Sequence, residues 1–185
     1  MKKLVILRGN SGSGNAFVSM PSLTQSIFLL ISSCEISIVL NPIFLCNALA
    51  TVVFPLPELP LSITNFFIDT KALPLMIELL KYGNEHSDIV ILEGIMYDEW
   101  YNPLFNVANE LYGANVYSYY FNIPFEETVR RHQTRSKSQE FGEEHMRQWW
   151  REKDFSSVLE EEIISCEMDA ECIIEKIYTD LLKYI

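Results

Sequence analysis

A glycine-rich loop close to the N-terminus holds the residues whose types and spacing are best suited to chemistry. Leu4 to Leu7 form a short apolar, β-prone run, after which the chain enters a turn in which half of the residues are small. At such a strand-to-loop junction, backbone N–H groups surround a phosphate, and glycine permits the tight bend. We therefore expect nucleotide phosphates to be bound by Gly9, Asn10, Ser11, Gly12, Ser13, Gly14 and Asn15.

Two positions at the end of this loop depart from the pattern G-x-x-x-x-G-K-[ST]. Gly9 and Gly14 fit its two glycines, but Asn15 and Ala16 stand where the pattern has a lysine and a hydroxyl. The lysine offsets charge on the transferred phosphate, and the hydroxyl binds Mg²⁺. Asn15 donates hydrogen bonds without bringing a charge, and Ala16 has no oxygen for magnesium. The alternative interpretation is a flexible linker, in which the same glycine and serine pattern is common.

A carboxylate follows another apolar run of the chain. Residues 88–92 predict a buried strand that ends at Glu93 and Gly94. The carboxyl ends of parallel strands border the ligand crevice of such folds. We therefore expect Glu93 to be a catalytic residue that holds a magnesium-bound water or faces the substrate. The alternative is a loop carboxylate with no role, and Asp88, at the far end of the strand, is expected to be structural.

A basic stretch from Arg130 to Lys137 offers cations for phosphate transfer. Arg131 and Arg135 are four positions apart on a predicted helix, so they share a face and can point at one ligand. We expect both to close over the phosphates and to stabilise charge during transfer. A solvated basic face is the alternative, and His132 is expected at the surface.

An aromatic pair follows this basic stretch. Trp149 and Trp150, with Arg151 and Asp154 after them, form either core packing or a substrate wall.

Composition limits the classes of partner and of site. The chain has 185 residues, enough for one domain with a sheet covered by helices on both faces. A net charge of −11 argues against non-specific binding of nucleic acid or of anionic membranes. No C-x-x-C spacing occurs among the four cysteines, so we expect no zinc site, assign no metal-ligating residue, and expect reduced thiols in the cytoplasm.

Residues 16–64 differ sharply in composition from the rest of the chain. The stretch has no Lys, Arg, Asp or Gly, and its only charges are Glu35 and Glu58. A membrane segment over residues 27–45 is one interpretation, but Glu35, Asn41 and Pro42 interrupt it and no basic flank follows, so we expect no membrane partner. A buried hairpin is another interpretation.

The genetic code offers a third explanation of this stretch. When its DNA is read on the complementary strand with a shift of one nucleotide, Pro codons yield Gly, Val and Thr exchange, Ala yields Ala and Glu yields Ser. Phe then yields Lys or Asn, and Leu yields Ser, Arg, Lys or Asn. Read backwards, residues 60–50 become G-N-S-G-S-G-K-T-T-V-A, an intact phosphate loop. Residues 68–61 permit M-K-K-L-V-I-L-R, the start of this chain, and residues 18–13 permit T-K-A-L-P-L, which stands at 70–75.

We therefore hypothesise that codons from about 15 to 68 are inverted relative to an ancestral gene. On this hypothesis, residues 16–67 were never selected as part of a folded protein, and we expect them to be the least ordered part of a single domain spanning 1–185. The loop lysine and threonine then exist only on the complementary strand.

The remaining sequence alternates strand and helix patterns. Helices are predicted from Leu73, with Pro74 in the first turn and Gly83 as the stop, and over residues 100–111 before Gly113. Further helices are predicted at 124–135, at 143–150 and after Asp169, and another strand at 116–121. This alternation predicts an α/β fold with a parallel sheet flanked by helices in three layers.

Several segments together resemble small bacterial P-loop kinases of the uridine-kinase-like or zeta-toxin-like type. They are K-K-L-V-I-L-R-G-N-S-G-S-G at the start, I-V-I-L-E-G at 89–94, Y-Y-F-N-I-P-F-E-E-T-V-R-R-H-Q-T-R-S-K at 119–137 and E-F-G-E-E-H-M-R-Q-W-W at 140–150. The resemblance covers residues 1–14 and about 69–185. It implies an ATP- and Mg²⁺-dependent phosphotransferase acting on a nucleotide and a small-molecule hydroxyl, with Glu93 at the metal or substrate edge and the helix 130–135 as a lid.

Loss of the loop lysine predicts that this chain is catalytically impaired. The alternative function is a non-enzymatic α/β domain that binds a nucleotide or a partner.

Overall fold

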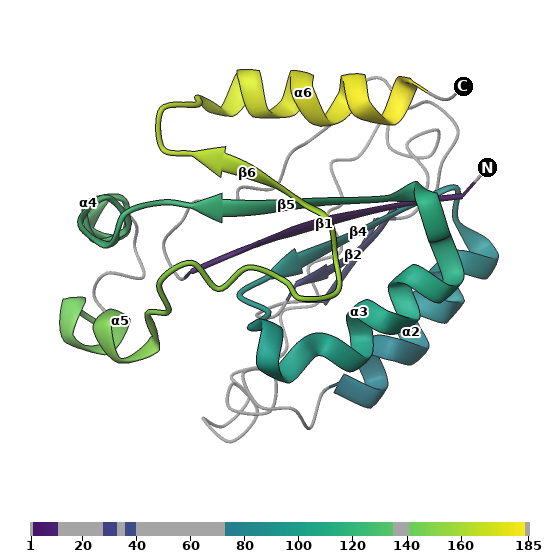
Figure 1. Cartoon of the computed structure of the whole chain (residues 1–185), viewed down its shortest axis with the longest axis horizontal. Coiled ribbons are helices and arrows are strands. Elements are labelled where there is room, and N and C mark those ends of the chain that lie inside the picture. Colours follow the sequence, from purple (N-terminus) through teal and green to yellow (C-terminus); the bar gives the residue numbers. More distant parts are fainter. Residues whose placement is uncertain (1, 11–27, 33–35, 40–72, 135–140, 184–185) are drawn as a thin grey trace.

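The computed structural model describes residues 2–10, 28–32, 36–39, 73–134 and 141–183, and its elements are named as in Figure 1. The strands are β1 (Lys3–Gly9), β2 (Phe28–Ser32), β3 (Ile36–Val39), β4 (Ile89–Gly94), β5 (Val116–Asn122) and β6 (Glu161–Ser165). The helices are α2 (Leu73–His86), α3 (Asp98–Tyr112), the short 3₁₀ helix η3 (Gly113–Asn115), α4 (Phe125–Gln133), α5 (Glu143–Trp149) and α6 (Ala170–Leu182).

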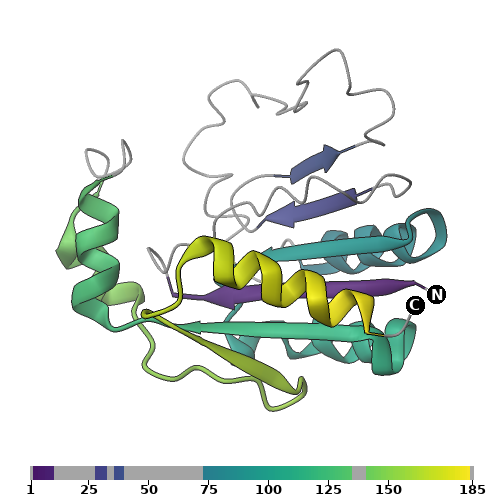
Figure 2. The ribbon, with the colours of Figure 1, turned by 90° about the horizontal axis from the view of Figure 1, so that it is seen from above.

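The described strands form one sheet in the order β3-β2-β4-β1-β5-β6. Neighbouring strands run parallel, except that β3 is antiparallel to β2. Helices α2 and α3 cover one face, and α6 covers the other, where it lies across the sheet (Figures 1 and 2). This is the predicted three-layer α/β fold with helices on both faces of a parallel sheet.

Strand β1 lies inside the sheet, and its side chains serve two separate cores. Leu4 and Ile6 pack in the core beneath α2 and α3, whereas Val5 and Leu7 pack in the core beneath α6. A strand buried on both faces is a near-continuous apolar run, because alternate side chains both leave water. The apolar opening of the chain is therefore explained by its central position.

The predicted helix ends are confirmed at two places and wrong at one. Gly113 follows α3 with a φ of 54°, a left-handed conformation that favours glycine. Asp169 caps α6, since its side chain accepts a hydrogen bond of 2.8 Å from the Cys172 N–H. Gly83 does not end α2: it is buried inside the helix, which continues to His86. A glycine in a helix gives close packing as well as a stop, and the sequence pattern does not separate these two uses.

The sequence analysis did not predict β6, and it offered β2 and β3, which pair antiparallel, only as the buried hairpin named as one alternative for residues 16–64. Strand β6 reads Glu-Glu-Ile-Ile-Ser and lies at the edge of the sheet, where Ile163 is half exposed and Ile164 is buried. Its two glutamates break the apolar pattern that identified the inner strands.

The expectation that residues 16–67 lack order falls on a stretch of which the structure describes only β2 and β3. The rest of it lies outside the described residues, and so does most of the 27–45 segment considered for a membrane. Within the described ranges, no helix has both the length and the apolar character needed to cross a membrane.

Two leucines of α2 test the core packing. Leu80 is fully buried, whereas Leu75 on the same helix is 44% exposed. We expect Leu80→Ala to lower the free energy of unfolding by about 2–5 kcal/mol, because it removes buried apolar atoms and leaves a cavity. Leu75→Ala, the matched control, is expected to cost less than about 1 kcal/mol. Urea denaturation of both variants measures the difference, and equal losses would contradict this account of the core.

Candidate functional site

Three neighbouring strands end together at one edge of the sheet. Arg8 of β1 lies opposite Gly94 of β4, and Gly9 lies opposite Phe121 of β5. The chain goes from β1 to β2 on one side and from β4 to β5 on the other, so the strand order reverses between β1 and β4. Such a topological switch point is where open α/β sheets bind ligands. Helices α4 and α5 lie beyond the same edge (Figure 1).

The predicted phosphate loop begins here. Gly9 is the last residue of β1 and Asn10 follows it, while Ser11, Gly12, Ser13, Gly14 and Asn15 lie outside the described residues. Asn10 is buried, and its amide is committed to the backbone of Arg151: Nδ2 donates to the Arg151 carbonyl at 2.7 Å, and Oδ1 accepts from the Arg151 N–H at 3.0 Å. Asn10 therefore joins the start of the loop to a segment far along the chain.

Glu93 lies near the carboxyl end of β4, as predicted. Its backbone pairs in register with Leu7 of β1 and Ser32 of β2, and its side chain is half-buried. Leu92 belongs to the core beneath α2 and α3, so the alternation along the strand places Glu93 on the α6 face. Arg8 leaves β1 on the opposite face, and Glu93 and the Arg8 side chain are therefore on different sides of the sheet.

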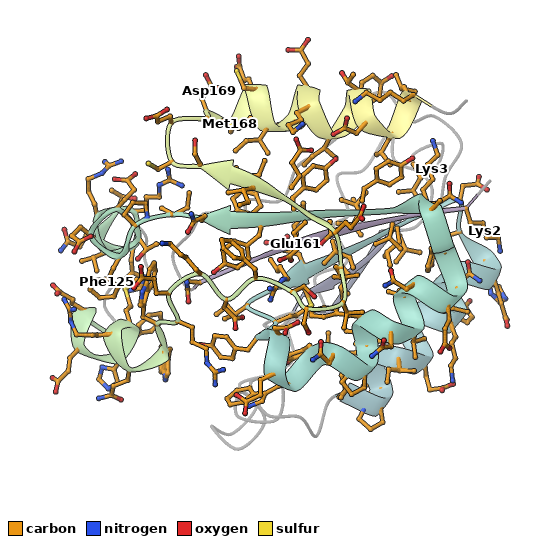
Figure 3. The ribbon with its side chains drawn as sticks, in the orientation of Figure 1. Lys2, Lys3, Phe125, Glu161, Met168 and Asp169 are labelled. Carbon is orange, nitrogen blue, oxygen red and sulfur yellow. The ribbon has the colours of Figure 1, made fainter. Side chains whose placement is uncertain are left out.

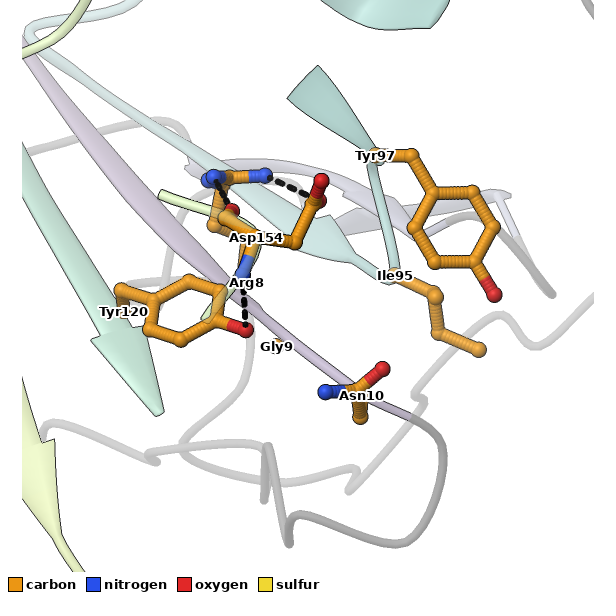
Figure 4. A pocket seen from close by; sticks show the side chains of 7 residues that line it. All are labelled: Arg8, Gly9, Asn10, Ile95, Tyr97, Tyr120 and Asp154. Atoms are coloured by element: carbon orange, nitrogen blue, oxygen red, sulfur yellow. Dashed lines mark hydrogen bonds and ion pairs between the residues drawn. The ribbon is translucent and has the colours of Figure 1, made fainter. Parts of the chain in front are cut away.

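A small pocket lies at the end of β1 on the α3 side (Figure 4). It is lined by Arg8, Gly9, Asn10, Ile95, Tyr97, Tyr120 and Asp154. These residues come from β1, from the loop after β4, from β5 and from the segment between α5 and β6. Burial raises the pKa of Tyr97 and of Tyr120. The Tyr97 hydroxyl donates to the Trp149 carbonyl, and the Tyr120 hydroxyl accepts from the Asp154 N–H at 3.1 Å.

Arg8 is the most deeply buried charge of this pocket, with 1% of its surface exposed. Its guanidinium bonds to the carboxylates of Glu161 and Asp154, the latter at 3.3 Å, and donates to the backbone carbonyls of Met96 and Asp154. The guanidinium carbon lies 5.1 Å from the centre of the Tyr120 ring. Two carboxylates and two carbonyls thus compensate the buried charge, as a charge removed from water requires.

Residues 150–160 form a segment that we name the strap. Asp154 and Glu161, which bond to Arg8, also fix the strap to the sheet and to α3. Asp154 Oδ2 also accepts from the Asp98 N–H at 3.1 Å, and the Asp154 N–H donates to the Tyr120 hydroxyl at 3.1 Å. Asp98 Oδ1 in turn accepts from Ser156 Oγ at 3.0 Å. Glu161, at the start of β6 (Figure 3), accepts from the Ser156 N–H at 2.6 Å. The strap therefore connects α5 to β6 along the wall of the pocket.

The predicted lid arginines lie on or after α4. Arg131 is half-buried and donates to Glu127 at 2.7 Å, and Arg130 bonds to both oxygens of the same carboxylate at 2.6 and 2.7 Å. Hydrogen bonds from Arg130 first, and then from Arg131, lower the pKa of Glu127 to about 2. Arg135 lies outside the described residues. The Arg131 charge is thus held beyond the carboxyl edge with a carboxylate partner.

An aromatic cluster joins α4 to α5 and corrects one prediction. His132 is buried and not at the surface: its ring stacks on Phe141 at 4.4 Å, and Nε2 lies 2.9 Å from the Phe141 carbonyl. Trp150 packs edge-on against Phe125 at 5.2 Å, and Trp149 against Phe141 at 5.3 Å. The tryptophan pair therefore packs α4 and the start of the α5 segment together, and Asp154 lines the pocket.

Sequence reasoning found Gly9 and Asn10 but missed the other residues that line the pocket. Arg8 was considered only as the residue that precedes the loop. A charged residue at the end of an apolar strand is itself a signal, because a buried charge needs a partner of opposite charge. Asp154 was noted without its partner, and neither Glu161 nor Tyr120 was singled out. Among the described residues, no group of three His, Cys, Asp or Glu side chains is placed to hold a metal ion.

Comparison with known proteins gives similarity in fold. No protein-family model and no curated protein matches the sequence. Among solved structures, the chain is similar to APE1195 with a TM-score of 0.57 and 13% identity, covering 100% of this chain and 96% of that chain. Shikimate kinase from Acinetobacter baumannii, in complex with shikimate, is similar with a TM-score of 0.53 and 16% identity, covering 100% of this chain and 97% of that chain. A sugar kinase from Janibacter sp. HTCC2649 is similar with a TM-score of 0.51 and 15% identity, covering 98% of this chain and 96% of that chain. The chain therefore shares the α/β fold of these solved structures, two of which are kinases.

Removal of the buried guanidinium tests the Arg8 cluster. We expect Arg8→Ala to lower the free energy of unfolding by about 3–5 kcal/mol, because Asp154 and Glu161 are left buried without their cation. Lys81→Ala, which breaks an exposed pair with Glu78, is the control and is expected to cost at most about 1 kcal/mol. Chemical denaturation at pH 7 measures both, and a small effect of Arg8→Ala would show that the cluster contributes little.

Acid is expected to release the pair on α4. The folded pKa of Glu127, about 2, lies below its ordinary value of 4.5, so the contribution of this carboxylate is complete above about pH 4.5 and is lost as pH falls through 2. We expect a carboxyl NMR titration to give this low pKa, and Arg130→Ala to raise it further than Arg131→Ala does. An unchanged pKa in the Arg130 variant would contradict the assignment.

Proposed function

We propose that this protein is an ATP-dependent phosphotransferase of the small-molecule kinase class, and that its own chain transfers phosphate poorly. The observation that carries the proposal is the position of the glycine loop. Strand β1 has parallel neighbours on both sides and runs into Gly9 and Asn10 at the carboxyl edge of the sheet. A helix N-terminus or glycine loop at that edge is where such folds hold phosphate groups.

Each predicted site residue has a role in this proposal. The backbone N–H groups from Gly9 to Asn15 hold phosphate oxygens of ATP, and the Asn10 side chain, which is bound to Arg151, leaves the inside of the loop to the ligand. Glu93, on the α6 side of the same edge, faces the metal or the substrate. Arg131 and Arg135 on the lid bring positive charge over the phosphates, with Glu127 holding Arg131 in the absence of ligand.

The assignment to one type of kinase rests on the segments of this sequence that resemble that type, at 1–13, 89–94, 119–137 and 140–150. The proposal places the chain with the uridine-kinase-like or zeta-toxin-like kinases, with a small hydroxyl compound as the phosphate acceptor. Kinases among the structurally similar proteins support the class. The proposal places the protein in the cytoplasm, where the exposed thiols of Cys166 and Cys172 would stay reduced.

The residues present do not fit a complete magnesium site. The position that carries the magnesium-binding hydroxyl in intact loops is Ala16, and Asn15 replaces the lysine. In enzymes, removal of one preorganised contact to developing charge lowers kcat by about 10²–10³. We therefore attribute the impairment to these two positions, and we attribute their presence to inversion of codons from about 15 to 68.

A repaired chain tests both parts of this proposal. Residues 15–69 are replaced by the translation of codons 54 back to 19 on the complementary strand, which restores Lys-Thr-Thr after Gly14. We expect this chain to bind ATP at least tenfold more tightly and to transfer phosphate at least about 10² times faster, because a loop charge stabilises the transition state. Calorimetry with Mg-ATP and a coupled assay against nucleosides, sugars and antibiotics measure both quantities. Resequencing the gene across codons 15 and 68 examines the inversion directly.

The controls separate loss of activity from loss of fold. Replacing the restored lysine by alanine is expected to abolish the gain without changing the thermal transition. A repaired chain that unfolds cooperatively but neither binds ATP nor transfers phosphate would overturn the kinase proposal and favour a non-enzymatic binding domain. Substantial Mg-ATP turnover by the original chain would overturn the proposed impairment.

A further inference from the structure

Arg151 lies where the strap meets the phosphate loop. Its backbone N–H and carbonyl both bond to the side chain of Asn10, at 3.0 and 2.7 Å. Asn10 is the second residue of the predicted loop and is buried. The structure therefore fixes the main chain of Arg151 next to the place where phosphates are expected, although 141 positions separate the two residues in sequence.

The guanidinium of Arg151 lies against the ring of Tyr97, one of the residues that line the pocket. Its central carbon is 4.4 Å from the centre of the Tyr97 ring and 4.9 Å from that of Trp100. Tyr97 lines the pocket together with Gly9 and Asn10 (Figure 4). Two aromatic faces hold a cation in place through their quadrupoles, and this restricts the long side chain before any ligand arrives.

The present partner of this guanidinium is easily exchanged. Arg151 Nη1 lies 3.0 Å from Glu99 Oε2, and the side chain of Glu99 is 71% exposed while that of Arg151 is 34% exposed. Exposed ion pairs of this kind contribute little to stability. Arg8, in contrast, is buried between two carboxylates and two carbonyls and has no charge to spare for a ligand. Arg151 therefore combines a fixed position with a weakly held counter-ion.

We propose that Arg151 is a binding residue that contacts a phosphate oxygen of the ligand at the loop. The Glu99 carboxylate stands in for that oxygen in the free protein and leaves when the ligand binds. Arg151 thereby supplies part of the positive charge that Asn15 does not provide. The inference rests on the proposed function in placing a phosphate at the loop. Planar guanidinium suits phosphate better than an ammonium does, because it donates two parallel hydrogen bonds.

Pyrophosphate binding to the full chain tests this inference. The probe is titrated into wild-type, Arg151→Ala, Arg151→Lys and Glu99→Gln proteins, and the Trp100 indole and Arg151 Nε–H NMR signals are followed. We expect Arg151→Ala to weaken binding at least tenfold, because a charge-assisted contact is lost, and Arg151→Lys to weaken it less. Glu99→Gln is expected to tighten binding about two- to fivefold, because the competing carboxylate is removed.

Matched variants exclude simple charge and folding effects. Glu152→Gln removes the same charge from a neighbouring residue that is 78% exposed and pairs with Lys153, and it is expected to change binding less than twofold. In the double variant Arg151→Ala with Glu99→Gln, the tightening is expected to vanish, since its target is gone. Tightening that persists in the double variant, or an Arg151→Ala protein that binds as the wild type does, overturns the inference. Thermal unfolding of every variant checks that the fold is retained.

The same variants in the repaired chain keep this inference distinct from the proposed function. Absence of saturable pyrophosphate binding to the wild-type chain overturns the role of Arg151 in this chain, whatever the repaired chain does. ATP transfer by the repaired chain that is unaffected by Arg151→Ala leaves the kinase function intact and overturns the inference. If ATP competes with pyrophosphate, the phosphate that Arg151 contacts is that of the nucleotide. If ATP and pyrophosphate bind together, Arg151 contacts an anionic group of the acceptor. Both outcomes support the contact.

Discussion

The buried charge of Arg8 is the interaction on which the carboxyl edge of this protein depends. A guanidinium with 1% exposure is tolerated only because Asp154, Glu161 and two carbonyls surround it. Its carboxylate partners belong to the strap and to β6, so the bonds that neutralise Arg8 also fix the path of the chain between α5 and β6. Met96, whose carbonyl is one of the acceptors, brings the loop after β4 into the same arrangement. The pocket at the end of β1 is a product of this electrostatic requirement.

The sequence predicted the parts of the fold that follow from local patterns. Strands β1, β4 and β5 and the caps at Gly113 and Asp169 were found because apolar periodicity and capping residues are short-range signals. Strand β6 was missed because an edge strand needs few apolar residues. Gly83 was misassigned because glycine occurs both at buried positions inside helices and at helix ends, and the sequence pattern is the same in both cases. The three-layer arrangement followed from the alternation of strands and helices.

The candidate site was predicted only in part, for a different physical reason. Gly9, Glu93 and Arg131 were found because the ends of strands and the faces of helices can be located from the sequence. Asp154 lines the pocket and bonds to Arg8, and Arg151 bonds to Asn10; the two residues of each pair are more than 140 positions apart, and no local pattern encodes such pairings. His132 was placed at the surface because its helix is strongly charged, yet its ring completes the aromatic contact between α4 and α5.

The amide of Asn10 gives the first turn of the phosphate loop an unusual kind of support. By donating to one main-chain carbonyl and accepting from the N–H of the same residue, it imitates a peptide group and forms the equivalent of a single rung of a β-ladder. The strap thus gains strand-like pairing with β1 although it is no strand. Aspartate could not replace this amide, because it would turn an acceptor toward the Arg151 carbonyl, and alanine would leave two backbone groups unpaired. The identity of one loop residue is therefore set by the main chain it pairs with, independently of any ligand.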